Sequence, residues 1–207
     1  MRTETTTRTL YLLHELPEDV QQKACEKFNE HGLDHDWWEY TYSDFETICE
    51  IIGVDIGRRQ NSKGSEPKIY FSGFWSQGDG ASFFGRYRYA KDSKKKIREH
   101  APQDTELHRI ADALFDIQKA HSYTLAAEIT SLGSNYSHSN TMSVESYHET
   151  KEITSETYKE VQRLLRSLAD WLYEGLQAEH EYLTSFESFK EQCEANEYEF
   201  TEDGRLA

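Results

Sequence analysis

The chain has 207 residues, of which 36% are hydrophobic and 13% aromatic, and its formal net charge at pH 7 is −15. This length suits one sizeable domain, and so acidic a surface repels phosphate backbones, so we expect no direct nucleic-acid binding. No apolar stretch reaches the ~18 residues of a membrane span, and the start lacks the apolar core of a signal peptide. We therefore expect a cytoplasmic protein without membrane contact.

Motifs for metal, cofactor or nucleophilic chemistry are missing from the sequence. The three cysteines, Cys25, Cys49 and Cys193, are widely spaced and form no CxxC pair, and the nine histidines form no HExxH motif. No glycine-rich phosphate loop or serine elbow is present. We expect no metal and no cofactor, and a binding protein rather than an enzyme. Cys25 and Cys49 fall in amphipathic segments and are predicted core residues.

The first half of the chain begins with a predicted strand and two predicted helices. Residues 5–13 alternate in polarity and favour a strand. Pro17 suits the first position of a helix and Gly32 its end, and residues 34–53 repeat the helical spacing.

The next segments are shorter and more polar. Residues 54–56 favour a short strand, and residues 58–67 a polar loop. Residues 68–90 are predicted to form a hairpin, and residues 91–103 a basic connector.

The second half alternates helix, hairpin and helix. Asp104 is placed to cap a helix over residues 104–121. One face of that helix carries Leu107, Ile110, Ala111, Leu114 and Gln118. A second hairpin is predicted with strands containing Leu125, Ala127 and Ile129, then Met142 and Val144, and a turn near Gly133 to Ser137.

From Ser155 a long helix is predicted to Ala178 or beyond, followed by a helix or turn near residues 185–196 and an edge strand or docked tail at residues 198–207. Without a linker or repeat, residues 1–207 are predicted to be a single α+β domain. Its antiparallel hairpins would form a small sheet packed against several helices.

The first hairpin contains the stretch FSGFWSQGDGASFFGRY, residues 71–87. A two-residue turn at Asp79 and Gly80 would place Trp75 opposite Phe84. One face then carries Tyr70, Phe74, Phe83, Tyr87 and Tyr89, and is predicted to be buried.

The opposite face of that hairpin mixes rings and charges, which suits neither a core nor an ordinary solvated face. It carries Phe71, Trp75, Phe84, Arg86 and Arg88. Arginine stacked on rings is a feature of binding surfaces. Gly73 and Gly85 leave notches that same-hairpin rings, another backbone or a ligand could fill. The candidate binding surface is Trp75, Phe84, Arg86 and Arg88 with Gln77 and Asp79 at the tip.

Two further groups are candidates for function. Trp37 and Trp38 are ~100° apart on a helix, so both can hardly face one core and one of them is a candidate exposed anchor. We include Trp37 in the candidate binding surface. If the two hairpin tips converge, Asp79, Tyr136 and His138 would form an alternative polar site for acid–base work.

Several long segments resemble a known family. These are DWWEYTYSDFETICEIIGVDI, IYFSGFWSQGDGASFFGRY, APQDTELHRIADALFDIQKA, NYSHSNTMSVE and FTEDGR, in this order. They are similar to a family of small, functionally uncharacterised phage and prophage proteins, some of which are labelled antitoxins of toxin–antitoxin stability systems. The resemblance implies a protein of mobile-element origin in the host-cell cytoplasm. This chain has Phe84 where the family commonly has an acidic residue.

Three functions are compatible with these features. The first is an antitoxin-like or anti-defence inhibitor that binds a host or phage protein. The second is a small-molecule binder or small enzyme with its site between the hairpin tips. The third is an acidic mimic of DNA, which a contiguous stripe of carboxylates would support.

Overall fold

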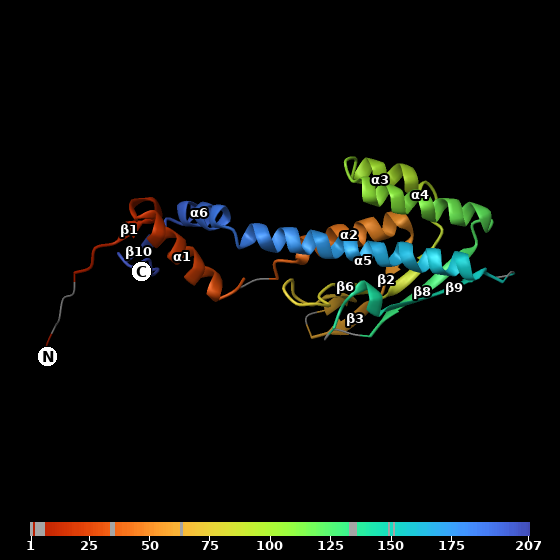
Figure 1. The fold of residues 1–207 in the computed structure, drawn as a ribbon, viewed down its shortest axis with the longest axis horizontal. Helices are drawn as coiled ribbons and strands as arrows, with labels where there is room; N and C mark the ends of the chain where they lie inside the picture. The colour runs from red at the N-terminus through yellow and green to blue at the C-terminus, as the bar shows by residue number, and fades with distance from the viewer. Residues whose placement is uncertain are drawn as a thin grey trace. The chain divides into compact units, whose positions relative to one another are not determined.

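The computed structural model describes residues 2, 7–33, 36–62, 64–132, 136–148, 150 and 152–207 (Figure 1). The fold is α+β, as predicted, because helices combine with small antiparallel sheets. The chain divides into two compact units, a larger one of residues 39–177 and a smaller one of residues 1–38 with 178–207. That residues 1–207 form a single domain stays a prediction.

A four-stranded antiparallel sheet organises the larger unit. Its strands are β2 (Val54–Ile56), β7 (Gly85–Arg88), β8 (Leu125–Ser131) and β9 (Met142–His148), and they lie in that order. The predicted second hairpin is confirmed by the pairing of β8 with β9, although residues 133–135 of its turn lie outside the described residues. Alternation buries one face, to which Tyr87, Ala127 and Val144 belong, and leaves Asp55, Arg86 and Glu145 exposed on the other.

The helices of the larger unit lie on one side of the strands in Figure 1. They are α2 (Glu39–Ile52), α3 (Ser93–His100), α4 (Thr105–Ala120) and the part of α5 (Ser155–Leu183) up to residue 177. The predicted face of α4 is confirmed, since all five of its residues are buried. Asp104 caps α4, because its Oδ1 accepts a 2.9 Å hydrogen bond from the Leu107 N–H. No helix in the described part of the chain is long and apolar enough to cross a membrane.

The basic connector predicted for residues 91–103 is wrong, because α3 occupies most of it. Ser93 and Ile97, one helical turn apart, are buried. Lys94 and Arg98 form ion pairs of 3.2 and 2.7 Å with Asp112 of α4. A single apolar residue gives no periodic signal, so the packing that forms α3 could not be recognised in the sequence.

The polar loop predicted for residues 58–67 is also wrong. Strands β3 (Arg58–Asn61) and β4 (Gly64–Pro67) pair as a hairpin. Arg59 lies opposite Glu66 and forms a 2.9 Å ion pair with it. This cross-strand charge pair stabilises the hairpin, and there is no apolar alternation, which is why the pattern resembles a loop.

The predicted hairpin over residues 68–90 is correct only in part. Strands β5 (Ile69–Phe71) and β6 (Ala81–Phe83) pair, with Phe71 opposite Ala81. The chain then leaves this pair at Phe84 and enters the four-stranded sheet as β7. The predicted register with Trp75 opposite Phe84 is wrong, because residues 72–80 form a nine-residue connection instead of a two-residue turn.

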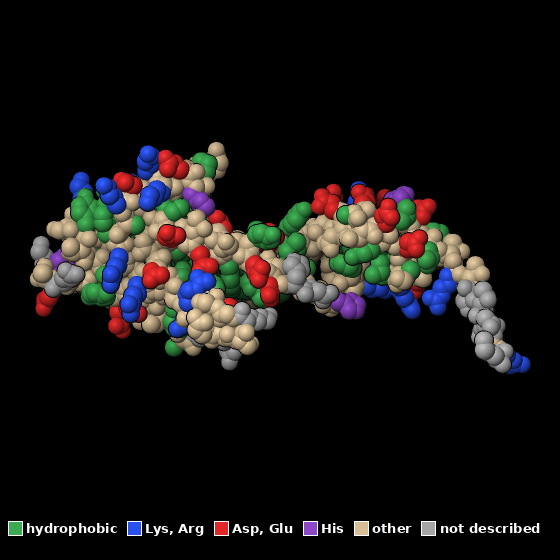
Figure 2. Space-filling model, turned by 180° about the vertical axis from the view of Figure 1, so that it is seen from behind, with side chains coloured by type: hydrophobic (Ala, Val, Ile, Leu, Met, Phe, Trp, Pro, Cys, Tyr) green, Lys and Arg blue, Asp and Glu red, His purple; other side chains and the backbone are tan. Residues whose placement is uncertain are grey.

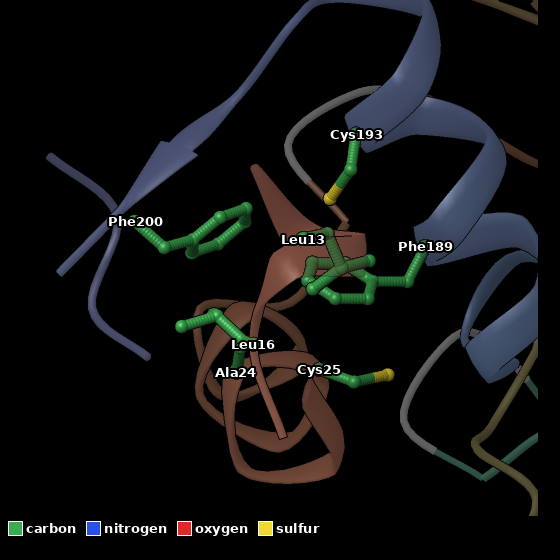
Figure 3. Close-up of a cluster of buried hydrophobic side chains, with 7 residues drawn as sticks. All are labelled: Leu13, Leu16, Ala24, Cys25, Phe189, Cys193 and Phe200. Atoms are coloured by element: carbon green, nitrogen blue, oxygen red, sulfur yellow. The ribbon is translucent and has the colours of Figure 1, made fainter. Parts of the chain in front are cut away.

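The smaller unit joins both ends of the chain. It contains β1 (Tyr11–Leu12), the 3₁₀ helix η1 (Leu13–Glu15), α1 (Glu18–Glu30), α6 (Phe186–Ala195) and β10 (Glu199–Phe200). The strand predicted for residues 5–13 is limited to β1 within the described residues, and β10 pairs with it as the expected edge strand. Figure 3 shows the core, which contains Leu13, Leu16, Ala24, Cys25, Phe189, Cys193 and Phe200.

Candidate functional site

The connection between β5 and β6 is a closed loop, which we call the 72–80 loop. The Asp79 Oδ2 atom accepts hydrogen bonds from the backbone N–H groups of Trp75, at 2.8 Å, and Ser76, at 2.6 Å. Gly73 and Gly78 have φ angles of 64° and 95°, which L side chains rarely adopt. Asp79, predicted at the tip of a tight turn, therefore closes a wider loop from inside.

Residues 136–138 of the β8–β9 connection brace this loop. The Ser72 hydroxyl donates a 2.9 Å hydrogen bond to the Ser137 carbonyl. A Cβ added to Gly78 would overlap the Tyr136 ring, and one added to Gly80 would lie 2.9 Å from the His138 Cα. The two tips therefore converge, and they are in direct contact at both glycines.

Aromatic stacking attaches the same loop to the helices. The Phe74 ring is 5.7 Å from that of Phe71 and 5.5 Å from that of Tyr173 on α5. Tyr42 of α2 meets Phe71 edge-on at 6.4 Å. Burial raises the pKa of Tyr173, and the negative charge of Asp79 raises it further. Phe74 is thus the anchor of the loop, although it is half-buried and does not lie on a buried hairpin face as predicted.

The outer part of the loop is solvent-exposed. Trp75 is 79% exposed and Tyr136 58% exposed, and Gln77 is also exposed. We call Trp75, Gln77 and Tyr136 the tip surface. A large exposed ring on a loop held by side-chain hydrogen bonds and packing is unusual, because such rings normally complete a core.

The residues of the alternative polar site are brought together, and one atom each of Asp79 and His138 is engaged in local hydrogen bonds. Asp79 accepts from Trp75 and Ser76, while the His138 Nδ1 accepts a 3.0 Å hydrogen bond from the Asn140 N–H at the start of the 3₁₀ helix η2 (Ser139–Thr141). No hydrogen bond joins Asp79 to His138 among the described residues. Gly78 and Gly80 contact Tyr136 and His138 directly, so the tips pack together at these two positions.

The outer face of β7 carries Arg86 and Arg88, both exposed as predicted, with half-buried Phe84 preceding them. Arg86 forms a 2.9 Å ion pair with Glu128 of β8. Gly85 is no ligand notch, since its missing Cβ would lie 2.6 Å from the Asp55 carbonyl oxygen of β2. The Gly73 notch is likewise covered, by the Asp79 carboxylate rather than by a ring.

A groove of about 800 Å³ runs beside this face, between α2 and strands β2 and β7. Arg58, Arg86 and Arg88 line it together with Glu46 and Glu50. Arg58 pairs with Glu46. Sequence reasoning missed Arg58 and Glu46, because the segment containing Arg58 was predicted to be a loop, and only the strand β3 directs Arg58 to the groove.

Trp37 is not an exposed anchor, and that part of the prediction is wrong. It is 8% exposed, and its ring lies 5.4 Å from that of His180. Its neighbour Trp38 is half-buried. Among the three aromatic residues of the candidate binding surface, Trp75 is therefore the most exposed, Phe84 is half-buried and Trp37 is buried.

The negative charge is unevenly distributed between the units. Residues 1–38 and 178–207 carry 17 Asp and Glu against 6 Lys and Arg, whereas residues 39–177 carry 21 against 17. In Figure 2 acidic side chains gather along one side of the smaller unit. Ion pairs such as Arg59–Glu66 and Arg98–Asp112 intersperse the charges of the larger unit, which argues against a stripe of carboxylates there. Among the described residues no three His, Cys, Asp or Glu side chains are placed to share a metal ion.

Comparison with known protein families places the larger unit in one family. A family model described as a domain of unknown function (DUF8835) matches residues 37–186, and the chain belongs to this family. The match covers the whole larger unit, including the tip surface and the groove, while most of the smaller unit lies outside it. No curated protein and no solved structure matches the chain.

Proposed function

We propose that this protein binds another protein through the tip surface of its larger unit. The observation that carries the proposal is Trp75, 79% exposed on a loop that Asp79 closes and residues 136–138 brace. Trp and Tyr dominate the binding energy of protein interfaces. A loop already held in one conformation loses little entropy on binding, so its rings contribute more of their burial to affinity.

The partner we propose is a host or phage protein that the chain inhibits in the host cytoplasm, in the manner of an antitoxin or an anti-defence protein. This part rests on the resemblance to phage and prophage proteins. The hydrogen bonds of Asp79 Oδ2 and His138 Nδ1 hold local structure, which favours a binding role over acid–base work at this site.

The test is native mass spectrometry of the tagged full-length chain purified gently from its host. We expect a co-purifying protein, and we expect Trp75→Ala to reduce its recovery at least tenfold without lowering the melting temperature, because an exposed ring adds little to stability. The matched control is Tyr147→Ala, which removes a 47% exposed ring from β9.

Arg86→Ala tests whether the interface extends along β7 from Phe84 to Arg88. A reduced recovery would include this face in the site. Unchanged recovery with both Trp75→Ala and Arg86→Ala would show that the partner binds elsewhere.

A small molecule is the second candidate ligand, and the groove beside β7 is the observation that favours it. Its volume of about 800 Å³ lies within the range of ligand pockets, and Arg58, Arg86 and Arg88 line it. A bound small mass that Arg88→Glu removes, with no protein partner, would support this function. Mimicry of DNA is a third candidate, and the excess of Asp and Glu in the smaller unit supports it there.

A further inference from the structure

The smaller unit contains a cavity of about 570 Å³ between α1 and the C-terminal turn. Its apolar walls include Phe28, Phe200 and Leu206. The turn is well defined, since Thr201 N–H donates to the Arg205 carbonyl at 2.9 Å and Gly204 lies against α1, where its missing Cβ would be 3.0 Å from the Val20 carbonyl oxygen. The volume falls in the range of small-molecule pockets.

The rim of this cavity is cationic. Lys27, His31 and Arg205 line it, and among the described residues no Asp or Glu does. Lys27 and Arg205 are two of the six Lys and Arg in a unit that carries 17 Asp and Glu. Chance placement would favour an acidic rim. A second cavity in the same unit, of about 260 Å³, does have acidic lining residues, Glu194 and Glu197 among them.

Within the part of the chain that the structure describes, the Lys27 ammonium at the rim forms no ion pair. The Arg205 Nε forms a 2.8 Å ion pair with Asp203, while Lys27 Nζ donates to the Asp203 backbone carbonyl at 3.1 Å. A hydrogen bond from Thr201, with the charges of Arg205 and Lys27, lowers the pKa of Asp203, which therefore stays ionised at neutral pH. Only Arg205 therefore contacts a carboxylate, and a ligand with a single negative charge would pair with Lys27.

We propose that this cavity binds an amphipathic monoanion, a molecule with an apolar chain or ring and one carboxylate. The apolar body would contact Phe28, Phe200 and Leu206, and the carboxylate would meet Lys27 and Arg205. The site is independent of the tip surface, since it lies in the other unit and uses none of the same residues.

The acidity of the unit does not exclude such a ligand. At physiological ionic strength charges farther than ~8 Å apart are largely screened, whereas a carboxylate in direct contact with Lys27 and Arg205 would lie well within that distance. The local cations therefore dominate at the carboxylate. Chain length should matter as well, because each buried methylene strengthens binding about fourfold.

The experiment is isothermal titration of the full chain with decanoate below its micelle concentration, with decanol as the uncharged counterpart. We expect decanoate to bind at least tenfold more tightly than decanol. The double variant Lys27→Gln/Arg205→Gln should weaken decanoate at least tenfold while decanol binding stays within twofold. Retained decanol binding shows that the cavity is still folded.

Two further variants complete the test. Lys23→Gln is the matched control, because Lys23 lies one turn earlier on α1, pairs with Asp19 and does not line the cavity. It should leave decanoate binding unchanged. Leu206→Ser, at a 54% exposed position, should weaken both ligands several-fold. Equal affinity for decanoate and decanol, equal effects of Lys23→Gln and the double variant, or no binding of either ligand would overturn the proposal.

Discussion

Gly78 lies so close to the ring of Tyr136 that a Cβ on Gly78 would be 2.8 Å from the Tyr136 Cζ and would overlap its hydroxyl. The two residues belong to different hairpin connections, 58 positions apart in the chain. Gly78 also has a φ of 95°. Close approach and backbone conformation therefore both require glycine where the 72–80 loop meets Tyr136.

Gly78→Ala should displace the 72–80 loop from Tyr136. The positive φ costs roughly 1 kcal/mol for alanine, and the overlap adds to it, so the loop should open rather than the sheet unfold. We expect faster hydrogen exchange at the Trp75 and Ser76 amides, measured by NMR, with the β8–β9 amides unchanged.

The control for Gly78→Ala is the same substitution combined with Tyr136→Ala. Removing the ring relieves the overlap but leaves the φ cost, so part of the amide protection should return. If the double variant exchanges as fast as the single one, contact with Tyr136 is not what constrains the loop.

Asp79→Ala should open the loop by a different route. The carboxylate accepts hydrogen bonds from the N–H groups of Trp75 and Ser76, and both would lose their partner. At this partly exposed site the free energy of unfolding should fall by about 1 kcal/mol. Asp79→Asn keeps one carbonyl oxygen and should retain most of the protection. Urea unfolding with amide exchange measures both effects, and identical behaviour of the two variants would contradict the role of the acceptor oxygen.

Asp104→Ala should be the more destabilising aspartate substitution. Its Oδ1 caps α4 through Leu107, and its Oδ2 accepts a 2.7 Å hydrogen bond from the Trp171 indole N–H of α5. Losing the cap and leaving the indole unpaired should lower the free energy of unfolding by about 2–3 kcal/mol.

The control for Asp104→Ala is Asp116→Ala, at an exposed position on the same helix, which should change the free energy of unfolding by less than about 0.5 kcal/mol. Urea denaturation curves compare the two. A small effect at both positions would show that Asp104 does not join α4 to α5.

Alkaline pH should destabilise the folded chain through its buried thiols. Burial raises the pKa of Cys49 well above 9.0 and that of Cys193 to about 11. Below pH 9 the thiol is neutral in both states, so the full stability is present. Above pH 9 the unfolded thiol ionises and the folded one does not, so stability falls as pH rises. For Cys49 the slope approaches about 1.4 kcal/mol per pH unit.

Urea unfolding at pH 8, 9 and 10 measures this slope. Cys49→Ala should be less stable than the unchanged chain at pH 8, because removing the thiol leaves a cavity in the core. Its free energy of unfolding should fall less between pH 9 and 10, because it has no thiol at this position to ionise. In the folded chain at pH 8, all three buried thiols should react slowly with a disulfide reagent and quickly in guanidinium. Fast reaction of Cys49 in the folded chain would contradict its burial.

Apart from α3, the helices and the β8–β9 hairpin could be predicted because their signals are local. The face of α4 and its Asp104 cap follow from a repeat of 3.6 residues and one capping side chain. Helix α3 and the β3–β4 hairpin could not be predicted. Helix α3 has Ile97 as its one buried apolar residue and pairs with α4 through Arg98–Asp112, and the hairpin carries the cross-strand pair Arg59–Glu66.

The candidate site was predictable in composition but not in geometry. Trp75, Asp79 and Tyr136 were all recognised, yet the predicted turn placed Asp79 at an exposed tip, whereas its carboxylate closes the loop. A turn signal such as GDG reports local backbone preference. It does not report that Ser72 and Gly78 meet residues 136–138 of a distant connection, and that contact selects the longer loop.

The sequence by itself determined which faces of the helices and strands are apolar, because the periods of 3.6 and 2 are properties of the local backbone. Only the tertiary structure decided which rings those faces bury. Positions 37 and 75 are both tryptophan and both lie in stretches rich in aromatic residues, yet Trp37 is 8% exposed and Trp75 is 79% exposed. Burial depends on what distant segments bring alongside, and that information lies in long-range contacts rather than in the pattern around either tryptophan.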